Sequence, residues 1–255
     1  MSPVPRENRM KRALAGGGRA FGTWIMDARH QAIVRQIAAA DFDFVVLEME
    51  HSSLSWETIG DFCEMSRASG ITPIVRPAEL TRESTLRLLE IGAMGVMFHD
   101  VDDRDEVEHA RDWILRSKSM QRPDKARQVA DGVALVIQIE TLRGLEQVEA
   151  NVSAGGVDVV EIGRGDLASE MGYPGQRNHS QVNAAIDRIV AACNRYGVAA
   201  AVTCLSHEDA EDIARRGVRC ISYSTDRYIL DRAYEDAMCK FDALGLRNGR
   251  RNEHP

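Results

Sequence analysis

Short apolar runs alternate with helical patterns along nearly the whole chain, and this alternation constrains the possible folds more than any other feature. Residues 133–137 (VALVI) are a clear example, because they contain no polar side chain that could face solvent. Such runs are typical of strands that lie in a parallel sheet and are covered on both faces. The predicted strands are residues 21–26, 44–48, 72–76, 95–98, 133–140, 157–162, 198–203 and 220–223.

Helical patterns fill the stretches between most of these strands. They are predicted at residues 30–40, 55–69, 82–91, 104–117, 180–196 and 207–215. Eight strand–helix units in this order indicate an α/β chain that forms a single (β/α)8 TIM barrel. The competing architecture, an open doubly wound sheet, would carry a GxGxxG turn after its first strand, whereas the glycine-rich segment 16–22 precedes that strand.

The length and apolar content of the chain suit one large core. It has 255 residues, of which 44% are hydrophobic, and no internal repeat or linker divides it. We expect an N-terminal extension at residues 1–20, a barrel catalytic domain at 21–245 and a polar tail at 246–255. Residues 117–131 are polar and basic, and they form either a long connection between the fourth and fifth units or a mobile loop.

Charge and cysteine content narrow the classes of partner and compartment. The formal net charge of -7 argues against nucleic acid or an anionic membrane as partner, since both select for basic patches. No apolar run approaches the roughly 20 residues that span a bilayer. The five cysteines are odd in number and none lies in a CxxC motif, which favours free thiols in a cytoplasmic protein.

Polar residues gather where a barrel would place its active site. That position is the C-terminal end of the strands. The candidate site residues found there are Trp24, Glu48, His51, Arg76, His99, Asp100, Gln138, Glu140, Arg164, Gly165 and Asp166.

Two of these carboxylates, Glu140 and Asp166, predict a metal site. An ionised side chain at the end of a buried strand is costly to desolvate unless a metal or a counter-charge compensates it. Two carboxylates with waters and a chelating substrate suit Mg²⁺ or Mn²⁺. Gly163 and Gly165 would let backbone N–H groups approach an anionic ligand closely. The alternative is a pair of salt-bridged carboxylates on the barrel rim.

Arg76 and His51 are the candidates for binding an anion and moving a proton. A guanidinium buried at a strand end requires a carboxylate or phosphate, which is either a substrate or a protein group such as Glu48 or Glu79. His51 follows two carboxylates, and an imidazole that a carboxylate orients can act as a general base. A capping or structural role is the alternative for His51.

Trp24 and His99 have weaker signals. Trp24 either forms a wall of the pocket or belongs to the core, and His99 either lines the pocket or has no role in it. No zinc-ligand spacing, GxSxG motif or P-loop is present in the sequence.

With these residues placed, the chain resembles the HpcH/HpaI family of metal-dependent (class II) pyruvate aldolases, within the phosphoenolpyruvate/pyruvate barrel superfamily. The resemblance extends from about residue 21 to residue 230. The segments that carry it, in order, are FGTWIM, DFDFVVLEMEHSS, ITPIVRP, LRLLEIGAMGVMF, VIQIET and EIGRGDLASEMGYPG.

The resemblance implies a site for a divalent metal and a 2-oxo acid. Glu140 and Asp166 would be the metal ligands, with Mg²⁺, Mn²⁺ or Co²⁺ as the ion. Arg76 would hold the keto and carboxylate oxygens of pyruvate. Gly165 and Asp166 would offer backbone amides to the carboxylate, and Gln138 would help to orient the site.

The resemblance also implies a proton-transfer pair and an oligomer. His51 would be the catalytic base, oriented by the acid at Glu48. Members of the family assemble as hexamers in which C-terminal helices pack on neighbouring subunits. The apolar-striped segment 227–244 would do this here, in a homo-oligomer that is a hexamer or a trimer.

The chain departs from the family pattern at the site. Glu48 stands where the family has Asp, and Met49 where it has Gly. Arg164 adds a cation beside the expected metal site. His99 and Asp100 replace a proline and an apolar residue. These departures leave the metal and pyruvate half intact and indicate that the half for the second substrate has been rebuilt.

We therefore expect a divalent-metal-dependent carbon–carbon lyase, an aldolase that forms or cleaves a 4-hydroxy-2-oxo acid through a pyruvate-type enolate. Its substrates would be a small 2-oxo acid and an aldehyde or ketone, with Arg164, His99 and Asp100 contacting the second fragment. Two alternatives stay open. One is a lyase, decarboxylase or condensation enzyme of specialised metabolism with the same enolate chemistry, and the other is a non-catalytic barrel that binds an oxo acid.

Overall fold

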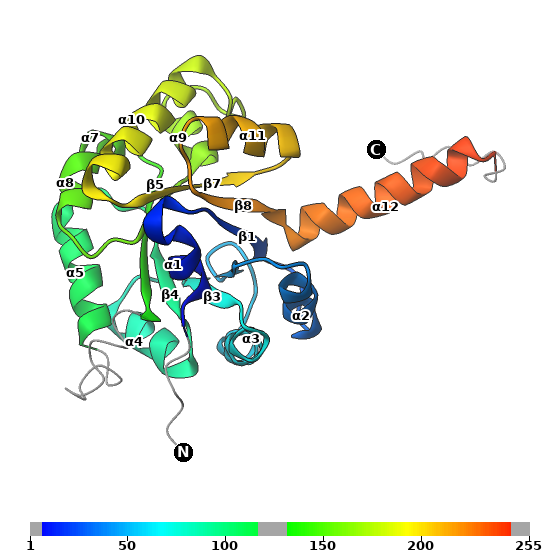
Figure 1. The fold of residues 1–255 in the computed structure, drawn as a ribbon, viewed down its shortest axis with the longest axis horizontal. Coiled ribbons are helices and arrows are strands. Elements are labelled where there is room, and N and C mark those ends of the chain that lie inside the picture. Colours follow the sequence, from blue (N-terminus) through cyan, green and yellow to red (C-terminus); the bar gives the residue numbers. More distant parts are fainter. Residues whose placement is uncertain (1–6, 117–131, 246–255) are drawn as a thin grey trace.

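Eight parallel strands close into a barrel in chain order, with β1 beside β8 (Figure 1). The structure is a computed structural model that describes residues 7–116 and 132–245. The predicted TIM barrel is confirmed, and every predicted strand is present to within two residues at each end. The strands are β1 (Ala20–Ile25), β2 (Phe44–Glu48), β3 (Thr72–Arg76), β4 (Gly95–Phe98), β5 (Ala134–Ile139), β6 (Val159–Ile162), β7 (Ala199–Cys204) and β8 (Cys220–Thr225).

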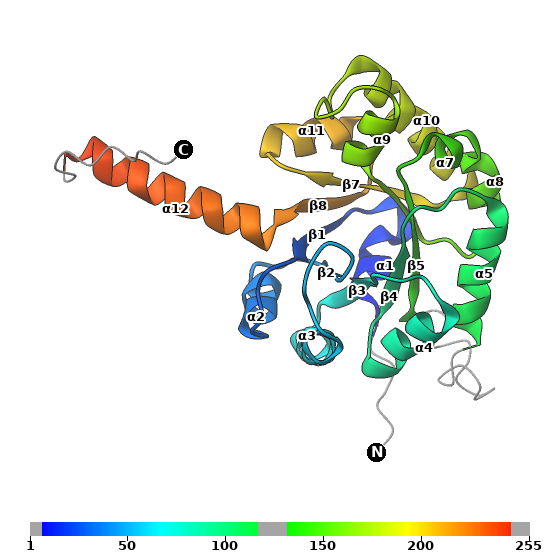
Figure 2. The ribbon, with the colours of Figure 1, turned by 180° about the vertical axis from the view of Figure 1, so that it is seen from behind.

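Helices follow the strands and surround the barrel on its outside, as Figure 2 shows from behind. The six helices predicted between strands are all present, although the last residue expected of the fourth, 117, lies outside the described residues. They are α2 (Ala32–Ala39), α3 (Trp56–Ser69), α4 (Arg82–Ile91), α5 (Arg104–Leu115), α10 (Ser180–Tyr196) and α11 (His207–Arg215).

Further short helical segments were not predicted. They have three to seven residues, too few to show a hydrophobic period. They are α1 (Arg9–Leu14), the 3-10 turn η1 (Ala15–Gly17), α7 (Leu142–Glu146), α8 (Val148–Ser153) and α9 (Arg164–Glu170).

The strands bury both of their faces, and successive side chains alternate between two apolar clusters. On β5, Leu135 and Ile137 pack outward against the surrounding helices. Ala134 and Val136 belong to an inner cluster that takes residues from all eight strands and therefore fills the barrel interior. Because side chains alternate along a strand, the sequence of each strand fixes what lies inside the barrel.

The helix α1 closes the N-terminal end of the barrel. Its Met10 is 1% exposed and packs with Leu14 in the inner cluster. The Asn8 side chain caps the helix by accepting a hydrogen bond from the backbone N–H of Lys11, and its amide donates to the carbonyl oxygens of Met94 and Gly132. Part of the segment expected as an N-terminal extension is thus packed into the barrel.

Capping residues mark the ends of several helices. The Ser55 hydroxyl accepts a hydrogen bond from the N–H of Thr58, and the Ser206 hydroxyl accepts one from Asp209. Gly70 and Gly197 end α3 and α10 with φ angles of 74° and 72°, the left-handed conformation that favours glycine.

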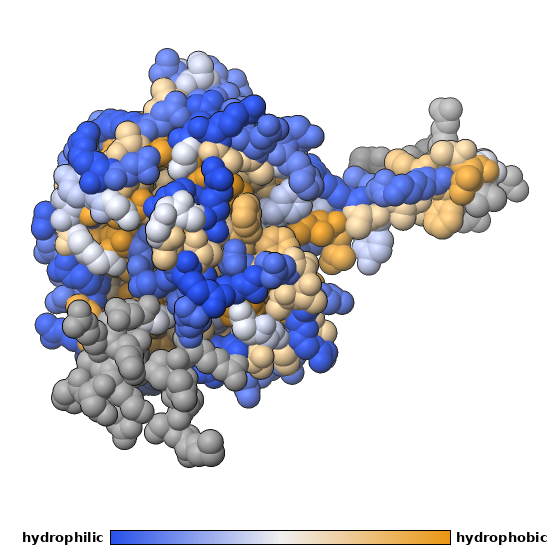
Figure 3. All heavy atoms as spheres, in the orientation of Figure 1, coloured by the Kyte–Doolittle hydropathy of each residue, from blue (hydrophilic) through white to orange (hydrophobic). Residues whose placement is uncertain are grey.

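The last helix, α12 (Asp226–Ala243), projects away from the barrel (Figures 1 and 3). It begins at Asp226, whose carboxylate accepts hydrogen bonds from the backbone N–H groups of Met26, Asp27 and Ala28 after β1. Beyond that anchor the helix exposes a series of large apolar side chains. They are Tyr228, Ile229, Leu230, Tyr234, Met238 and Phe241.

Within the described residues, no helix is long and apolar enough to cross a membrane. All five cysteines are free, and four of them are buried. The polar tail 246–255 and the candidate loop 117–131 lie outside the described residues.

Met10→Ala is expected to lower the free energy of unfolding by about 2–5 kcal/mol, because it leaves a cavity where α1 fills the barrel. Arg12→Ala, on the solvent side of the same helix, should change it by no more than about 0.5 kcal/mol. Urea unfolding followed by circular dichroism measures both. Equal stability of the Met10 variant and the wild type would contradict the role of α1 as a plug.

Candidate functional site

The barrel interior is apolar near α1 and polar at the C-terminal ends of the strands. The alternation that places Val46 and Val136 inside continues to the inward-facing side chains nearer the mouth. We call this set the polar layer. It comprises Glu48, Arg76, Gln138, Glu161 and Thr203, of which all but Thr203 are at most 8% exposed.

Arg76 lies at the centre of the polar layer's contacts. Its Nε donates to Glu48 Oε2 at 2.5 Å, and its Nη1 is 3.1 Å from Glu50 Oε2. The same Nη1 donates to Gln138 Oε1 at 3.3 Å. The ring of Trp24 lies 4.9 Å from the guanidinium carbon, within cation–π range. Arg76 is 8% exposed, and its charge is balanced by protein groups on three sides.

Glu48 fixes the loop that carries His51. Its Oε1 accepts hydrogen bonds from the backbone N–H groups of Glu50, at 2.5 Å, and His51, at 2.9 Å. Both of its oxygens are therefore occupied, one by Arg76 and the other by the loop backbone. The carboxylate next to the His51 ring belongs to Glu50, with 3.6 Å between Nε2 and Oε1. The His51 side chain is 65% exposed.

Glu140 is buried and lacks a cationic partner among the described residues. It is 6% exposed, its Oε2 accepts a hydrogen bond from Gln138 Nε2, and its Oε1 accepts one from the Asp100 N–H at 3.2 Å. Burial raises the pKa of Glu140 to about 7, and the carboxylates of Asp100 and Asp166 add to the shift. Binding of a cation nearby would remove this penalty.

Gly163 makes room for Glu140. A Cβ atom at position 163 would lie 2.5 Å from Glu140 Oε2 and 3.1 Å from Gln138 Nε2. A side chain is therefore excluded there. At Gly165 the nearest atom to such a Cβ is 3.4 Å away, on Arg177. A glycine is therefore required for steric reasons at position 163 but not at position 165.

Asp166 and Gly165 lie in the first turn of α9, directly after β6. The Asp166 side chain is exposed, and its charge is near enough to raise the pKa of Glu140. The first N–H groups of a helix have no intrahelical partner, so this turn can donate hydrogen bonds to an anion.

The donor set fits a hard divalent cation. Glu140 and Asp166 supply two carboxylates, one of them buried, and the absent side chain at Gly163 leaves room for the Glu140 carboxylate. Oxygen ligands of this kind are the ones that Mg²⁺ and Mn²⁺ prefer.

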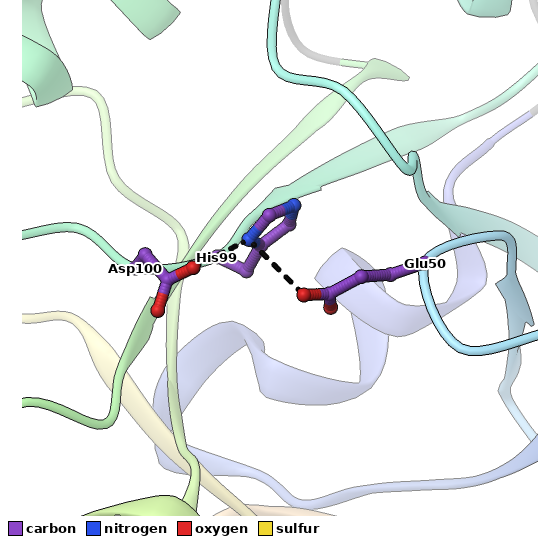
Figure 4. Close-up of side chains that lie close together, drawn as sticks. All are labelled: Glu50, His99 and Asp100. Carbon is purple, nitrogen blue, oxygen red and sulfur yellow. Dashed lines mark hydrogen bonds and ion pairs between the residues drawn. The ribbon is translucent and has the colours of Figure 1, made fainter.

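A second cluster of possible ligands lies at the ends of β2 and β4, where Figure 4 shows His99 between Glu50 and Asp100. His99 Nδ1 is 3.0 Å from Asp100 Oδ2 and 3.5 Å from Glu50 Oε1. Asp100 holds the left-handed φ of 52°, uncommon for a residue other than glycine. The Asp100 N–H connects this cluster to Glu140 by a hydrogen bond, and Glu50 connects it to Arg76 by an ion pair.

Arg164 lies apart from these groups. Its guanidinium binds both oxygens of Asp209, at 2.8 and 2.5 Å, and donates to the Thr203 carbonyl oxygen at 3.0 Å. Burial opposes ionisation of Asp209, but hydrogen bonds and charge from Arg164 hold its pKa below the usual value. Arg164 therefore fixes α9 to the start of α11. Met49, another departure from the family pattern, packs in the outer cluster.

Glu50 and Glu161 lie among the site residues but were not predicted from the sequence. Glu50 contacts Arg76, His51 and His99, so it connects three of the predicted site residues. Glu161 is 4% exposed in the polar layer. The signal for Glu161 was its alternation with Val160 and Ile162, which face outward and so predict that it faces the interior.

Known proteins match this chain over nearly its whole length. The family model for HpcH/HpaI aldolase/citrate lyase matches residues 21–230. A hydroxypyruvate/pyruvate aldolase of Paraburkholderia phytofirmans is 29% identical over 91% of this chain and 96% of the relative. A 4-hydroxy-2-oxo-heptane-1,7-dioate aldolase of Escherichia coli is 25% identical over 93% and 96%.

Solved structures agree with these relatives. The crystal structure of an HpcH/HpaI aldolase/citrate lyase family protein from Burkholderia cenocepacia J2315 is 26% identical and has a TM-score of 0.85, covering 92% of this chain and 99% of that one. The resemblance seen in the sequence is thus confirmed. The chain is an enzyme of the lyase type and belongs to the HpcH/HpaI aldolase/citrate lyase family.

Proposed function

We propose that this protein is a divalent-metal-dependent aldolase that forms or cleaves a 4-hydroxy-2-oxo acid through a pyruvate-type enolate. The observation that carries the proposal is Glu140, a buried carboxylate beside Asp166 that has no ion pair within the described part of the chain. The aldolase names of the relatives support a 2-oxo acid as one substrate. Glu140 and Asp166 would hold Mg²⁺, Mn²⁺ or Co²⁺.

Arg76 would bind the oxo acid. Contacts with Glu48, Gln138 and Trp24 hold its side chain in place, so the side chain loses little conformational freedom when the substrate binds. The N–H groups of Gly165 and Asp166, in the first turn of α9, would donate to the substrate carboxylate. The metal, when bound, supplies Lewis-acid stabilisation of the negative charge that develops on the keto oxygen.

His51 would move the proton to or from the aldol hydroxyl. Its exposed ring lies at the mouth of the barrel, and Glu50 is the carboxylate next to it. Glu48 would act indirectly, since it accepts hydrogen bonds from the backbone of the loop that carries the ring. General acid–base catalysis requires such a positioned group.

His99 and Asp100 would contact the second substrate, an aldehyde or ketone. They lie at the C-terminal end of β4, and Asp100 is hydrogen-bonded to Glu140 through its backbone. Arg164, expected to join them, has its guanidinium occupied by Asp209, so we assign it to holding α9 in place.

The subunits would assemble through α12. Six large apolar side chains on this helix are between 37% and 68% exposed, and the helix projects from the barrel (Figure 3). An exposed apolar stripe of this size is typical of a protein–protein contact. We propose a homo-oligomer, a hexamer or a trimer, in which α12 packs on a neighbouring subunit.

Removal of either metal ligand tests the reaction. Glu140→Gln and Asp166→Asn should each lower Mg²⁺-dependent cleavage of a 4-hydroxy-2-oxo acid by at least about 10-fold, because each removes a carboxylate ligand. Pyruvate release coupled to lactate dehydrogenase measures the rate. Glu170→Gln, an exposed acid on α9, is the control and should keep full activity. Full activity of the wild type in excess chelator would refute the metal assignment.

Substitution of Arg76 tests the oxo-acid site. Arg76→Lys keeps the positive charge but loses the planar donor fork, so exchange of deuterium into the methyl group of pyruvate should fall by about 100-fold or more. Arg82→Lys, half-exposed on α4, is the matched control. Exchange retained by Arg76→Lys would remove Arg76 from this role. A wild type that binds pyruvate with Mg²⁺ but exchanges no proton would be a binding barrel instead.

Substitutions that introduce charge on α12 test the proposed assembly. Tyr234→Asp combined with Phe241→Asp should dissociate the oligomer, because burying a carboxylate in an apolar contact is costly. Light scattering after gel filtration measures the mass. Tyr196→Asp, exposed on α10, should leave the mass unchanged. If the wild type is already a monomer, the assembly proposal is wrong.

A further inference from the structure

Glu161 is a buried carboxylate that the proposed reaction does not use. It lies on β6 in the polar layer, below the rim where Glu140 and Asp166 lie. Its hydrogen-bond partner is Thr203 on β7, with 3.0 Å between the hydroxyl and Oε1. Among the described residues it forms no ion pair. An acid in this position has a large desolvation cost and calls for an explanation.

A chain of hydrogen bonds runs from Glu161 towards Arg76. The Thr203 hydroxyl also contacts the indole Nε1 of Trp24, at 2.9 Å. The other end of this chain is the Trp24 ring, which lies against the Arg76 guanidinium at 4.9 Å. Four side chains from β6, β7, β1 and β3 are thus joined across the barrel interior.

The donors and acceptors set the direction of this chain. The indole N–H of Trp24 can only donate, so the Thr203 oxygen accepts from it. The single hydroxyl proton of Thr203 is then free to point to Glu161, which accepts it. Burial raises the pKa of Glu161 to about 7, while the Thr203 hydrogen bond and the charges of Arg76 and Arg164 oppose the rise. The Trp24 N–H, the Thr203 hydroxyl and the Glu161 carboxylate therefore each have a hydrogen-bond partner within this set.

This arrangement fixes the plane of Trp24. An indole ring in an apolar interior could rotate about its side-chain bonds, but its N–H would then lose its acceptor while buried. The ring is 6% exposed and belongs to the inner cluster. Because the ring forms one wall of the space around Arg76, its orientation limits where the guanidinium can lie.

We propose that Glu161 is a positioning residue, which holds Trp24 through Thr203 and thereby keeps Arg76 in the orientation that binds the oxo acid. The inference rests on the proposed function for the identity of the Arg76 ligand. The hydrogen-bonded chain itself can be tested without any ligand.

Three variants test the hydrogen bonds that join Glu161, Thr203 and Trp24. Thr203→Val removes the hydroxyl at almost constant volume, and Glu161→Leu removes the acceptor. Glu161→Gln keeps a carbonyl oxygen that can accept from Thr203, so it should rescue the arrangement. Ser222→Ala is the matched control, because Ser222 pairs with Thr203 in the sheet register and is buried, but its hydroxyl has no hydrogen-bond partner in the described structure.

Two measurements on ligand-free protein show whether these hydrogen bonds hold Trp24 and Arg76 in place. In a Trp56→Phe, Trp113→Phe background the fluorescence comes from Trp24 alone, because the sequence has three tryptophans. Thr203→Val and Glu161→Leu should shift its emission maximum, whereas Glu161→Gln and Ser222→Ala should not. The rate at which phenylglyoxal modifies Arg76, read by peptide mass spectrometry, should rise several-fold in the first two variants only.

Binding of pyruvate in the presence of Mg²⁺ then tests the consequence. Thr203→Val and Glu161→Leu should raise the dissociation constant by about tenfold or more, since a displaced binding group costs affinity. Glu161→Gln and Ser222→Ala should stay within about threefold of the wild type. The melting temperature of each variant shows whether it is folded.

The outcomes divide cleanly. Unchanged Trp24 emission and unchanged Arg76 reactivity in folded Thr203→Val would overturn the proposal. So would an equal loss of pyruvate affinity in Ser222→Ala. If Glu161→Leu fails to fold, Thr203→Val decides alone. A wild type that does not bind pyruvate would refute the proposed function, and the two ligand-free measurements would still decide whether Glu161 positions Arg76.

Discussion

The site is organised around one buried ion pair, between Arg76 and Glu48. These residues face each other in register on β2 and β3, and Arg76 Nε is 2.5 Å from Glu48 Oε2. Two charges in a barrel interior lose their hydration, and only close geometry with further hydrogen bonds offsets that loss. Gln138 and the loop backbone after β2 supply those bonds. The ends of three strands and the loop that carries His51 are therefore fixed by the pair.

The acidic residues on the two sides of this ion pair differ in whether a cation lies next to them. On one side, Glu50 lies between Arg76 and His99, so one acid there has a cationic partner. On the other side, the charge of Asp166 raises the pKa of Glu140, and no ion pair of Glu140 is present among residues 7–116 and 132–245. A buried carboxylate next to a second acid at the mouth of the barrel is a place where an added cation would offset an unfavourable local charge.

The sequence predicted the barrel and its strands well, because a strand covered on both faces has an apolar signature that needs no tertiary information. It also predicted that Arg76, Glu140 and Asp166 lie at strand ends. It could not assign partners: the tie between Arg164 and Asp209 joins residues 45 positions apart, and nothing local indicates it. The contact between His51 and Glu50, in place of Glu48, depends on how the loop folds back. The helix α1 was missed because six residues carry too little periodic signal.

The closure of the barrel by α1 has a kinetic consequence. Met10 and Leu14 pack against the inward-facing side chains at one end of the barrel, so in the proposed reaction substrates and products would both pass the opposite end, where the strands reach their C-terminal residues. In the proposed reaction the oxo acid binds against Arg76, deeper than the residues at the ends of β2 and β4 that would meet the second fragment. In that reaction the order of binding would follow from the depth of the two positions: the oxo acid would bind first, and in cleavage the aldehyde or ketone would leave before it.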